Sequence, residues 1–176
     1  MYIIPRKFIV MIMISIIAAY AHNRVIGNNG RIPWHIREEQ LHFKQLTLGS
    51  VLIMGRRTFG EILAKFGRGL PERETIILSR TQTLQGDNYR TVTSMQEALD
   101  YTKSQFPEKD IFICGGESVY REAMAMGLAE KLYLTEIELE VEGDAFFPQF
   151  DKSEYTLEEE KSIDGEIPYR LITLRK

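Results

Sequence analysis

Continuous apolar runs recur through the first two thirds of the chain and predict buried strands. Residues 51–54, 75–78 and 111–114 lack the alternation of a half-exposed strand, so they are typical of strands that are covered on both faces. Apolar residues at helical spacing follow the first run over residues 59–66 and the third over about 117–126. Strands that alternate with helices in this way predict crossover connections and a largely parallel sheet.

The later part of the chain adds a capped helix and then changes its pattern. Residues 94–97 (SMQE) match a capping box and predict a helix that runs to about Gln105. Over residues 133–142 apolar positions alternate with glutamates, which predicts a half-buried strand with one acidic, solvent-facing side. Residues 155–160 and 169–174 suggest a closing antiparallel pair. The predicted fold class is α/β with a mixed sheet.

The start of the chain supports two interpretations. Residues 8–21 are almost unbroken apolar sequence, preceded by the basic pair Arg6-Lys7 and ending in the small-x-small pattern of residues 19–21. These are the marks of a secretory signal. The run is shorter than the roughly 20 residues that a membrane-spanning helix needs. A continuous apolar run is equally typical of a buried strand, and the segment alone does not separate the two.

Composition narrows the classes of protein that the chain can belong to. Its 176 residues have the length of one domain, without a repeat or a low-complexity linker. Apolar residues make up 44% and charged residues 27%, which excludes a disordered or collagen-like chain. The net charge of -3 argues against a strongly basic nucleic-acid-binding protein. Cys114 is the single cysteine, so no internal disulfide forms and nothing requires an oxidising compartment.

Three of the predicted strands end in residues that are suited to binding an anion. Ligands of open α/β sheets bind beyond the carboxyl ends of the strands, often at helix N-termini. Residues 55–58 (GRRT) combine a glycine, a helix start and two arginines that can bind phosphate. Ser79-Arg80 likewise places an arginine at the end of a strand, and Gly115-Gly116 exposes backbone without side chains. A turn with a solvated arginine explains any one of these sites, but the three together favour binding of a phosphorylated nucleotide. Neither a G-x-G-x-x-G fingerprint nor a P-loop motif is present.

A carboxylate occupies the apolar face of the helix predicted to begin near residue 37. Ile36, Glu39, Phe43 and Leu46 share that face by three- and four-residue spacing. A carboxylate in apolar surroundings has a raised pKa and can manage protons or hold a cationic nitrogen heterocycle. Favourable charge in the first helical turn is the alternative role of Glu39. The three histidines lack the neighbours of a metal site, and no G-x-S-x-G elbow occurs.

Several of these segments, taken together and in order, resemble dihydrofolate reductase of the bacterial chromosomal type. The segments are ISIIAAYAHNRVIGNNGRIPW (14–34), Glu39 with Phe43, VLIMGRRTF (51–59), LPERETIILSR (70–80), IFICGGESVY (111–120), LYLTEI (132–137) and EGDAFFP (142–148). The resemblance is collinear over roughly residues 13–176. It implies an eight-stranded, mostly parallel sheet that is flanked by four helices and closed by a C-terminal antiparallel strand. It also implies NADPH-dependent reduction of 7,8-dihydrofolate to 5,6,7,8-tetrahydrofolate by a cytoplasmic monomer that binds antifolate-type molecules and neither nucleic acid nor membrane.

The resemblance implies a set of site residues, position by position. Glu39 matches the acidic catalytic residue that grips the amino group and ring nitrogen of the pterin. The other substrate-binding residues that it implies are Ile17, Ala18, Trp34, Gln40, Phe43, Lys44, Ile62, Arg68, Leu70, Arg73, Cys114, Tyr120 and Thr135, with Arg73 pairing the carboxylate of the glutamate tail. The cofactor-binding residues that it implies are Ala19, Ile26, Gly27, Asn28, Asn29, Gly30, Arg31, Ile32, Gly55, Arg56, Arg57, Thr58, Leu78, Ser79, Arg80, Cys114, Gly115, Gly116, Glu117, Ser118, Val119 and Tyr120. Within that set, Arg56, Arg57 and Arg80 select the 2′-phosphate of NADPH, and residues 28–32 form a mobile loop that closes over the nicotinamide.

The implied chemistry is hydride transfer to C6 of the pterin and protonation at N5. The implied site contains no second acidic residue near the pterin. We therefore expect a water molecule to deliver the proton, while Glu39 raises the basicity of N5 through the ring. Gln40 departs from the family pattern because an apolar residue is frequent there. Glu117 also departs and brings negative charge near the expected pyrophosphate site, so we expect its side chain to turn away. Residues 63–69 form a longer segment than in the shorter family members.

The resemblance favours the strand interpretation of the apolar start. Residues 14–19 align with the first central strand of the family, and cleavage after Ala21 would remove part of the site. We therefore expect one domain over residues 13–176, an adenosine-binding subdomain over about 50–107, and an upstream-start extension over residues 1–12.

Two other functions compete with this one. A pyrimidine reductase of riboflavin synthesis resembles the fold and the cofactor use, but it should lack the Glu39–Phe43 pattern and the Arg73 clamp. A non-catalytic folate- or nucleotide-binding module is the alternative outside the enzymes. The presence of Glu39 and of the intact loop over residues 28–32 argues against it.

Overall fold

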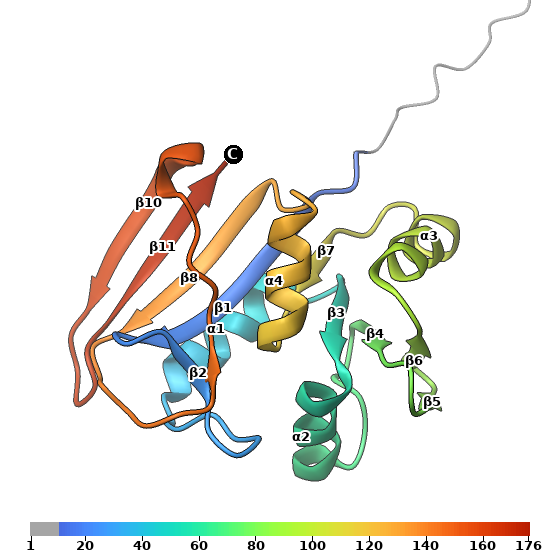
Figure 1. The fold of residues 1–176 in the computed structure, drawn as a ribbon, viewed down its shortest axis with the longest axis horizontal. Coiled ribbons are helices and arrows are strands. Elements are labelled where there is room, and N and C mark those ends of the chain that lie inside the picture. The colour runs from blue at the N-terminus through green and yellow to red at the C-terminus, as the bar shows by residue number, and fades with distance from the viewer. Residues whose placement is uncertain (1–10) are drawn as a thin grey trace, which may run out of the picture.

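One large sheet organises residues 11–176, the part of the chain that the computed structural model describes (Figure 1). The expected upstream-start extension lies outside the described residues, apart from residues 11 and 12. In chain order the elements are β1 (Ile14–Ala21), β2 (Val25–Gly27), α1 (Arg37–Thr47), β3 (Val51–Gly55), α2 (Arg56–Phe66), β4 (Glu74–Leu78), β5 (Gln85–Gly86), β6 (Tyr89–Val92), α3 (Met95–Gln105), β7 (Ile111–Ile113), α4 (Glu117–Ala125), β8 (Lys131–Ile137), β9 (Ala145–Phe146), a 3₁₀ turn η1 (Lys152–Glu154), β10 (Thr156–Ile163) and β11 (Tyr169–Arg175).

The sheet has the strand order β10-β11-β8-β1-β7-β3-β4-β6-β5. Neighbours from β8 to β6 are parallel, whereas β11 runs antiparallel to both β8 and β10. The predicted α/β class, the mostly parallel sheet and the antiparallel C-terminal strand are therefore confirmed. Within the described residues the sheet has nine strands rather than the expected eight, because the two-residue β5 pairs with the edge of β6. A separate small sheet joins β2 to β9.

The apolar stretch that opens the described chain forms the central strand β1. It lies between β7 and β8 and pairs in parallel with both. Its side chains are buried on both faces, which is why the sequence there is a continuous apolar run rather than an alternation. Ile16, Ala18 and Tyr20 point into one core, while Ile17 and Ala19 point to the other side. The strand prediction for this segment is thus confirmed.

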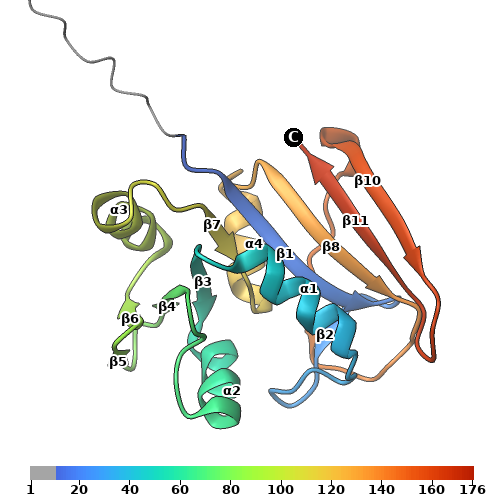
Figure 2. The same cartoon turned by 180° about the vertical axis from the view of Figure 1, so that it is seen from behind.

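Helices cover the two faces of the sheet in pairs (Figures 1 and 2). On one face α1 and α2 pack over a core that contains Ile17, Phe59 and Phe112. On the other face α3 and α4 pack over a larger core that contains Ile16, Leu99 and others. Apolar residues at helical spacing form each contact surface, as the sequence predicts for amphipathic helices. None of the helices in residues 11–176 is long and apolar enough to cross a membrane.

Strand β8 is shorter than the alternating pattern predicts. It ends at Ile137 rather than continuing to residue 142. The physical reason is the loss of both neighbours, because Ile137 pairs with the last residue of β1, Ala21, and with the first residue of β11, Tyr169. Beyond that point the chain turns away, and the alternation of glutamates continues into a loop.

Candidate functional site

Glu39 lies at the start of α1 and faces the sheet. Its side chain is half-buried, whereas its neighbour Glu38 is exposed. A side-chain hydrogen bond joins Glu39 to Thr135, a buried residue of β8. Removal of the carboxylate from water raises its pKa to about 7, and the hydrogen bond from Thr135 offsets only part of that rise. The group therefore exchanges a proton near neutral pH, as its place in an apolar stripe predicts.

Apolar side chains from β1, α1, α2 and two connecting segments lie on the same side of the sheet as Glu39. Ile17 of β1 and Leu70 are buried there, and Phe43 of α1, Ile62 of α2 and Cys114 pack against the same core. Burial raises the pKa of the Cys114 thiol, which keeps it neutral. These residues form apolar walls beside the carboxylate.

Three residues of the expected substrate set lie differently, namely Ala18, Trp34 and Tyr120, and Tyr120 belongs to the opposite core. Ala18 belongs to the opposite core, because successive side chains of a strand alternate between faces. A side-chain contact of Ala18 with a ligand beside Glu39 is therefore excluded, and only its backbone faces that side. Trp34 packs in a third, smaller core with Ile36.

Arg73 is a buried cation at the far end of the same face. Only 5% of its surface is exposed. Its Nε donates to the carbonyl oxygen of Pro71 at 3.0 Å, and its Nη1 donates to Thr47 Oγ1 at 3.3 Å. Among residues 11–176 no carboxylate forms an ion pair with Arg73, and burial lowers its pKa. A buried guanidinium that is held in place but not neutralised is suited to receive the carboxylate of a ligand.

The carboxyl ends of β3 and β7 meet at a glycine-lined cradle. The Gly55 N–H donates to the carbonyl oxygen of Gly115 at 2.8 Å. The peptide bond between Gly115 and Gly116 is cis, and Gly115 has a φ of 103°. A Cβ on Gly115 would lie 3.0 Å from the ring of Tyr120, and one on Gly116 would lie 3.3 Å from Thr58 Oγ1. Side chains are thus kept out of this corner, which leaves bare backbone at its surface.

Two helices begin at that cradle, and neither start is capped by a side chain. Gly55 precedes α2 and Gly116 precedes α4. Uncapped N–H groups at a helix start carry partial positive charge and bind anions. Arg56 donates to Gln82 Oε1 at 3.2 Å, whereas Arg57 and Arg80 are exposed. The sheet thus brings the three predicted anion-binding strand ends to one edge, because β7, β3 and β4 are parallel neighbours.

The predicted loop over residues 28–32 forms a tight hairpin. Asn28 and Arg31 form a two-way backbone bridge, with distances of 2.8 and 3.1 Å. The intervening Asn29 and Gly30 have φ values of 49° and 75°, the left-handed conformations of the Asn-Gly turn that suits a two-residue hairpin. The carboxylate of Asp144 accepts the Asn29 N–H at 3.1 and 3.2 Å.

Comparison with known proteins agrees with this arrangement. A family model described as dihydrofolate reductase matches residues 13–176. The chain is 36% identical to the dihydrofolate reductase of Bacillus subtilis (strain 168) over 159 residues, which cover 89% of each chain. It is 40% identical to the dihydrofolate reductase of Neisseria gonorrhoeae over 145 residues, 82% of this chain and 85% of the relative. It is 39% identical to dihydrofolate reductase type 3 of Salmonella typhimurium over 138 residues, 78% of this chain and 80% of the relative.

The chain belongs to the dihydrofolate reductase family. Within this dihydrofolate reductase fold, the expected residues Ile17, Phe43 and Ile62 share the α1 face of the sheet, and Gly55, Leu78 and Gly115 lie at adjoining strand ends. Gln40, Lys44 and Arg68 are exposed, and the amide of Gln40 contacts His35 Nδ1 at 3.2 Å. Ser79 closes its own turn, because its hydroxyl accepts the Gln82 N–H at 3.1 Å.

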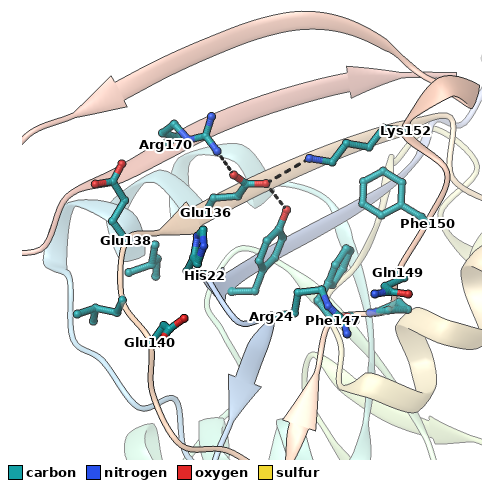
Figure 3. Close-up of a pocket in the computed structure, with 14 residues that line it drawn as sticks. His22, Arg24, Glu136, Glu138, Glu140, Phe147, Gln149, Phe150, Lys152 and Arg170 are labelled. Atoms are coloured by element: carbon teal, nitrogen blue, oxygen red, sulfur yellow. Dashed lines mark hydrogen bonds and ion pairs between the residues drawn. The ribbon is translucent and has the colours of Figure 1, made fainter.

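A cavity of the described structure lies apart from these residues (Figure 3). It measures about 1130 Å³, and no expected site residue lines it. At its centre Glu136 accepts a hydrogen bond from Tyr20 Oη at 2.9 Å and pairs with Arg170 and Lys152. Glu136 is only 18% exposed, so the prediction of a solvated acidic face is wrong at this position. Burial and the nearby carboxylate raise the pKa of Tyr20.

Sequence reasoning missed residues that support the site without lying at its centre. Asp144 fixes the hairpin and Thr47 holds Arg73, but neither stands out by composition or spacing. The segment EGDAFFP carries the family resemblance, yet it assigns no role to Asp144. The expectation that Glu117 turns away from the cradle is confirmed, because its carboxylate pairs with Arg121 and accepts the Phe146 N–H.

Proposed function

We propose that the chain catalyses the NADPH-dependent reduction of 7,8-dihydrofolate to 5,6,7,8-tetrahydrofolate. The observation that carries the proposal is the Glu39 carboxylate, half-buried among apolar side chains, with a pKa raised to about 7. A group that is poised near neutral pH can both accept a hydrogen bond from a protonated heterocycle and hold a proton for it. Membership of the dihydrofolate reductase family supports reduction of dihydrofolate, and the site residues support the use of NADPH and the hydride mechanism.

Glu39 has two tasks in this proposal. Its carboxylate binds the amino group and the adjacent ring nitrogen of the pterin, and it thereby raises the basicity of N5 through the ring. The apolar walls formed by Ile17, Phe43 and Ile62 exclude bulk water and strengthen these interactions. A single water molecule delivers the proton to N5, because no second acidic side chain is assigned to the site.

The glycine cradle and its arginines would hold NADPH. The bare backbone at Gly55 and Gly115-Gly116 and the uncapped starts of α2 and α4 fit a diphosphate group. Arg57 and Arg80 are exposed beside it and fit an additional 2′-phosphate. NADPH supplies the hydride that C6 of the pterin receives. We assign residues 50–107 to an adenosine-binding subdomain on the same grounds.

Arg73 would fix the other end of the substrate. A folate carries a glutamate tail, and the buried guanidinium of Arg73 has no protein carboxylate to pair with in the described structure. The hydrogen bonds to Pro71 and Thr47 fix the direction of the guanidinium plane. The pterin and tail contacts together orient C6 toward the cofactor side of the site.

A direct assay tests the proposal. The purified chain should oxidise NADPH, followed by its near-ultraviolet absorbance, only when dihydrofolate is present, and methotrexate should suppress the reaction. Glu39→Gln should abolish most of this activity, whereas the matched variant Glu38→Gln, at the exposed neighbour, should retain it. Absence of dihydrofolate-dependent oxidation in the wild-type chain would refute the proposal. The family resemblance favours a cytoplasmic monomer. Sedimentation tests whether the chain is monomeric.

A further inference from the structure

Glu117 joins two segments that lie far apart in the sequence. It is the first residue of α4. Its Oε2 accepts the backbone N–H of Phe146 at 2.9 Å, and its Oε1 pairs with Arg121 one helical turn later. The side chain is 29% exposed. The contact therefore ties β9 to the helix start that borders the glycine cradle.

The Phe146 N–H donates to Glu117 rather than to a backbone group of the small β2–β9 sheet. On either side of it, the Asp144 N–H donates to the carbonyl oxygen of Gly27 at 3.1 Å and the Phe147 N–H donates to that of Arg24 at 2.8 Å. Both of these bonds face β2. The Phe146 N–H faces the other way, toward α4, so β9 is held between β2 and Glu117.

The same segment also holds the hairpin of residues 28–31. The Asp144 carboxylate accepts the Asn29 N–H, and β2 leads directly into residues 28–31. A continuous set of hydrogen bonds thus runs from the start of α4 through Glu117 and β9 to Asn29. Each link is a direct contact or the short chain segment from Asp144 to Phe146.

We propose that Glu117 is a positioning residue that couples the diphosphate end of the dinucleotide site to the hairpin of residues 28–31. The inference rests on the proposed function, because it takes an NADPH diphosphate to bind at the start of α4. Negative charge there repels the Glu117 carboxylate and favours its contacts with Phe146 and Arg121. Those contacts hold β9, and β9 holds the hairpin. By thermodynamic reciprocity, a fixed hairpin then strengthens dinucleotide binding.

Amide hydrogen exchange on the full chain tests the coupling, with and without saturating NADPH. In the wild type, NADPH should slow exchange at both Phe146 and Asn29. Glu117→Ala should speed exchange of the Phe146 amide about tenfold or more, since it removes a hydrogen bond to a charged group, and it should abolish the effect of NADPH on Asn29. Glu117→Gln keeps an accepting oxygen and should restore most of the ligand-free protection of the Phe146 amide, but it lacks the negative charge, so NADPH should no longer slow exchange at Asn29. Glu122→Ala removes the same charge from an exposed position of the same helix and should behave as wild type.

Binding of NADPH, followed through the fluorescence of Trp34, the single tryptophan, is the second readout. Glu117→Ala should weaken binding about three- to tenfold, whereas Glu122→Ala should stay within about twofold of the wild type. Tighter binding by Glu117→Ala, or unchanged protection of Asn29, would overturn the coupling, since Glu117 would then act only as a repelling charge. If wild-type chain fails to bind NADPH at all, the proposed function fails and the coupling falls with it.

Discussion

The hydroxyl of Tyr120 on α4 donates a 2.8 Å hydrogen bond to the carbonyl oxygen of Ile17 on β1. Both residues are buried. The bond lies just past the last paired residues of β1 and β7, Ile16 and Ile113. Tyr120 therefore satisfies a carbonyl group where the neighbouring strand ends, and it fixes the part of β1 that borders both predicted ligand sites.

Tyr120→Phe should lower the free energy of unfolding by about 1–2 kcal/mol, because the buried Ile17 carbonyl loses its partner. Urea denaturation measures the change. Tyr101→Phe is the matched control, since no hydrogen bond of the Tyr101 hydroxyl is present among the described residues. Equal losses in the two variants would show that the Tyr120–Ile17 bond has no stabilising role.

Glu39→Gln should stabilise the ligand-free protein at high pH. The folded-state pKa of about 7 lies above the ordinary value of 4.5, so the folded state binds the proton more tightly and stability falls as the pH rises from about 4.5 to 7. The amide carries no such cost, so the variant should gain up to about 3 kcal/mol at pH 8 and almost nothing near pH 4.5. Urea denaturation at both pH values checks this, with Glu38→Gln as control. A gain that is the same at both pH values would contradict the raised pKa.

Arg73→Leu should weaken binding of the glutamate tail. Loss of charge-assisted hydrogen bonds predicts a rise of about 10- to 100-fold in KM for dihydrofolate, with kcat changed much less. A dihydropterin substrate that lacks the tail provides the internal control, because its KM should stay the same in the variant. Equal losses with both substrates would mean that the substitution damages the site in general.

Arg80→Ala should reduce the preference for NADPH over NADH. The exposed guanidinium is expected to contact the 2′-phosphate, which NADH lacks, so the KM for NADPH should rise about tenfold while that for NADH stays constant. Steady-state kinetics with both cofactors measures the ratio. Lys65→Ala, which removes an exposed cation from α2 outside the expected site, should leave the ratio unchanged. A parallel rise for both cofactors would place Arg80 outside the 2′-phosphate site.

Much of the fold could be predicted because its strands are buried on both faces. Continuous apolar runs mark β3, β4 and β7, and the Ser94 cap marks the start of α3, where its hydroxyl accepts the Glu97 N–H at 3.1 Å. The end of β8 could not be predicted in the same way. It depends on where β1 and β11 stop, and no local pattern around Ile137 records the length of its partners.

The site residues also differ in whether local sequence or contacts between distant segments determine their roles. Glu39 could be predicted because one helix places it in an apolar stripe, a feature that spacing records directly. Asp144, Thr47 and the Phe146 N–H act through contacts between distant segments, and a backbone N–H has no side-chain signature at all. The partial burial of Glu136 could not be predicted for the same reason, since Tyr20 and Arg170 approach it from other strands.

The pH dependence of kcat/KM for dihydrofolate, measured for the wild-type chain and for Glu39→Gln with saturating NADPH, tests the central role of Glu39 most directly. In the wild type, kcat/KM should decline above about pH 7, where the free enzyme loses the Glu39 proton. Turnover of Glu39→Gln should be about 100-fold slower or more at pH 7, with a smaller difference at low pH, where protonated substrate is available. Unchanged turnover of Glu39→Gln at pH 7 would contradict the account.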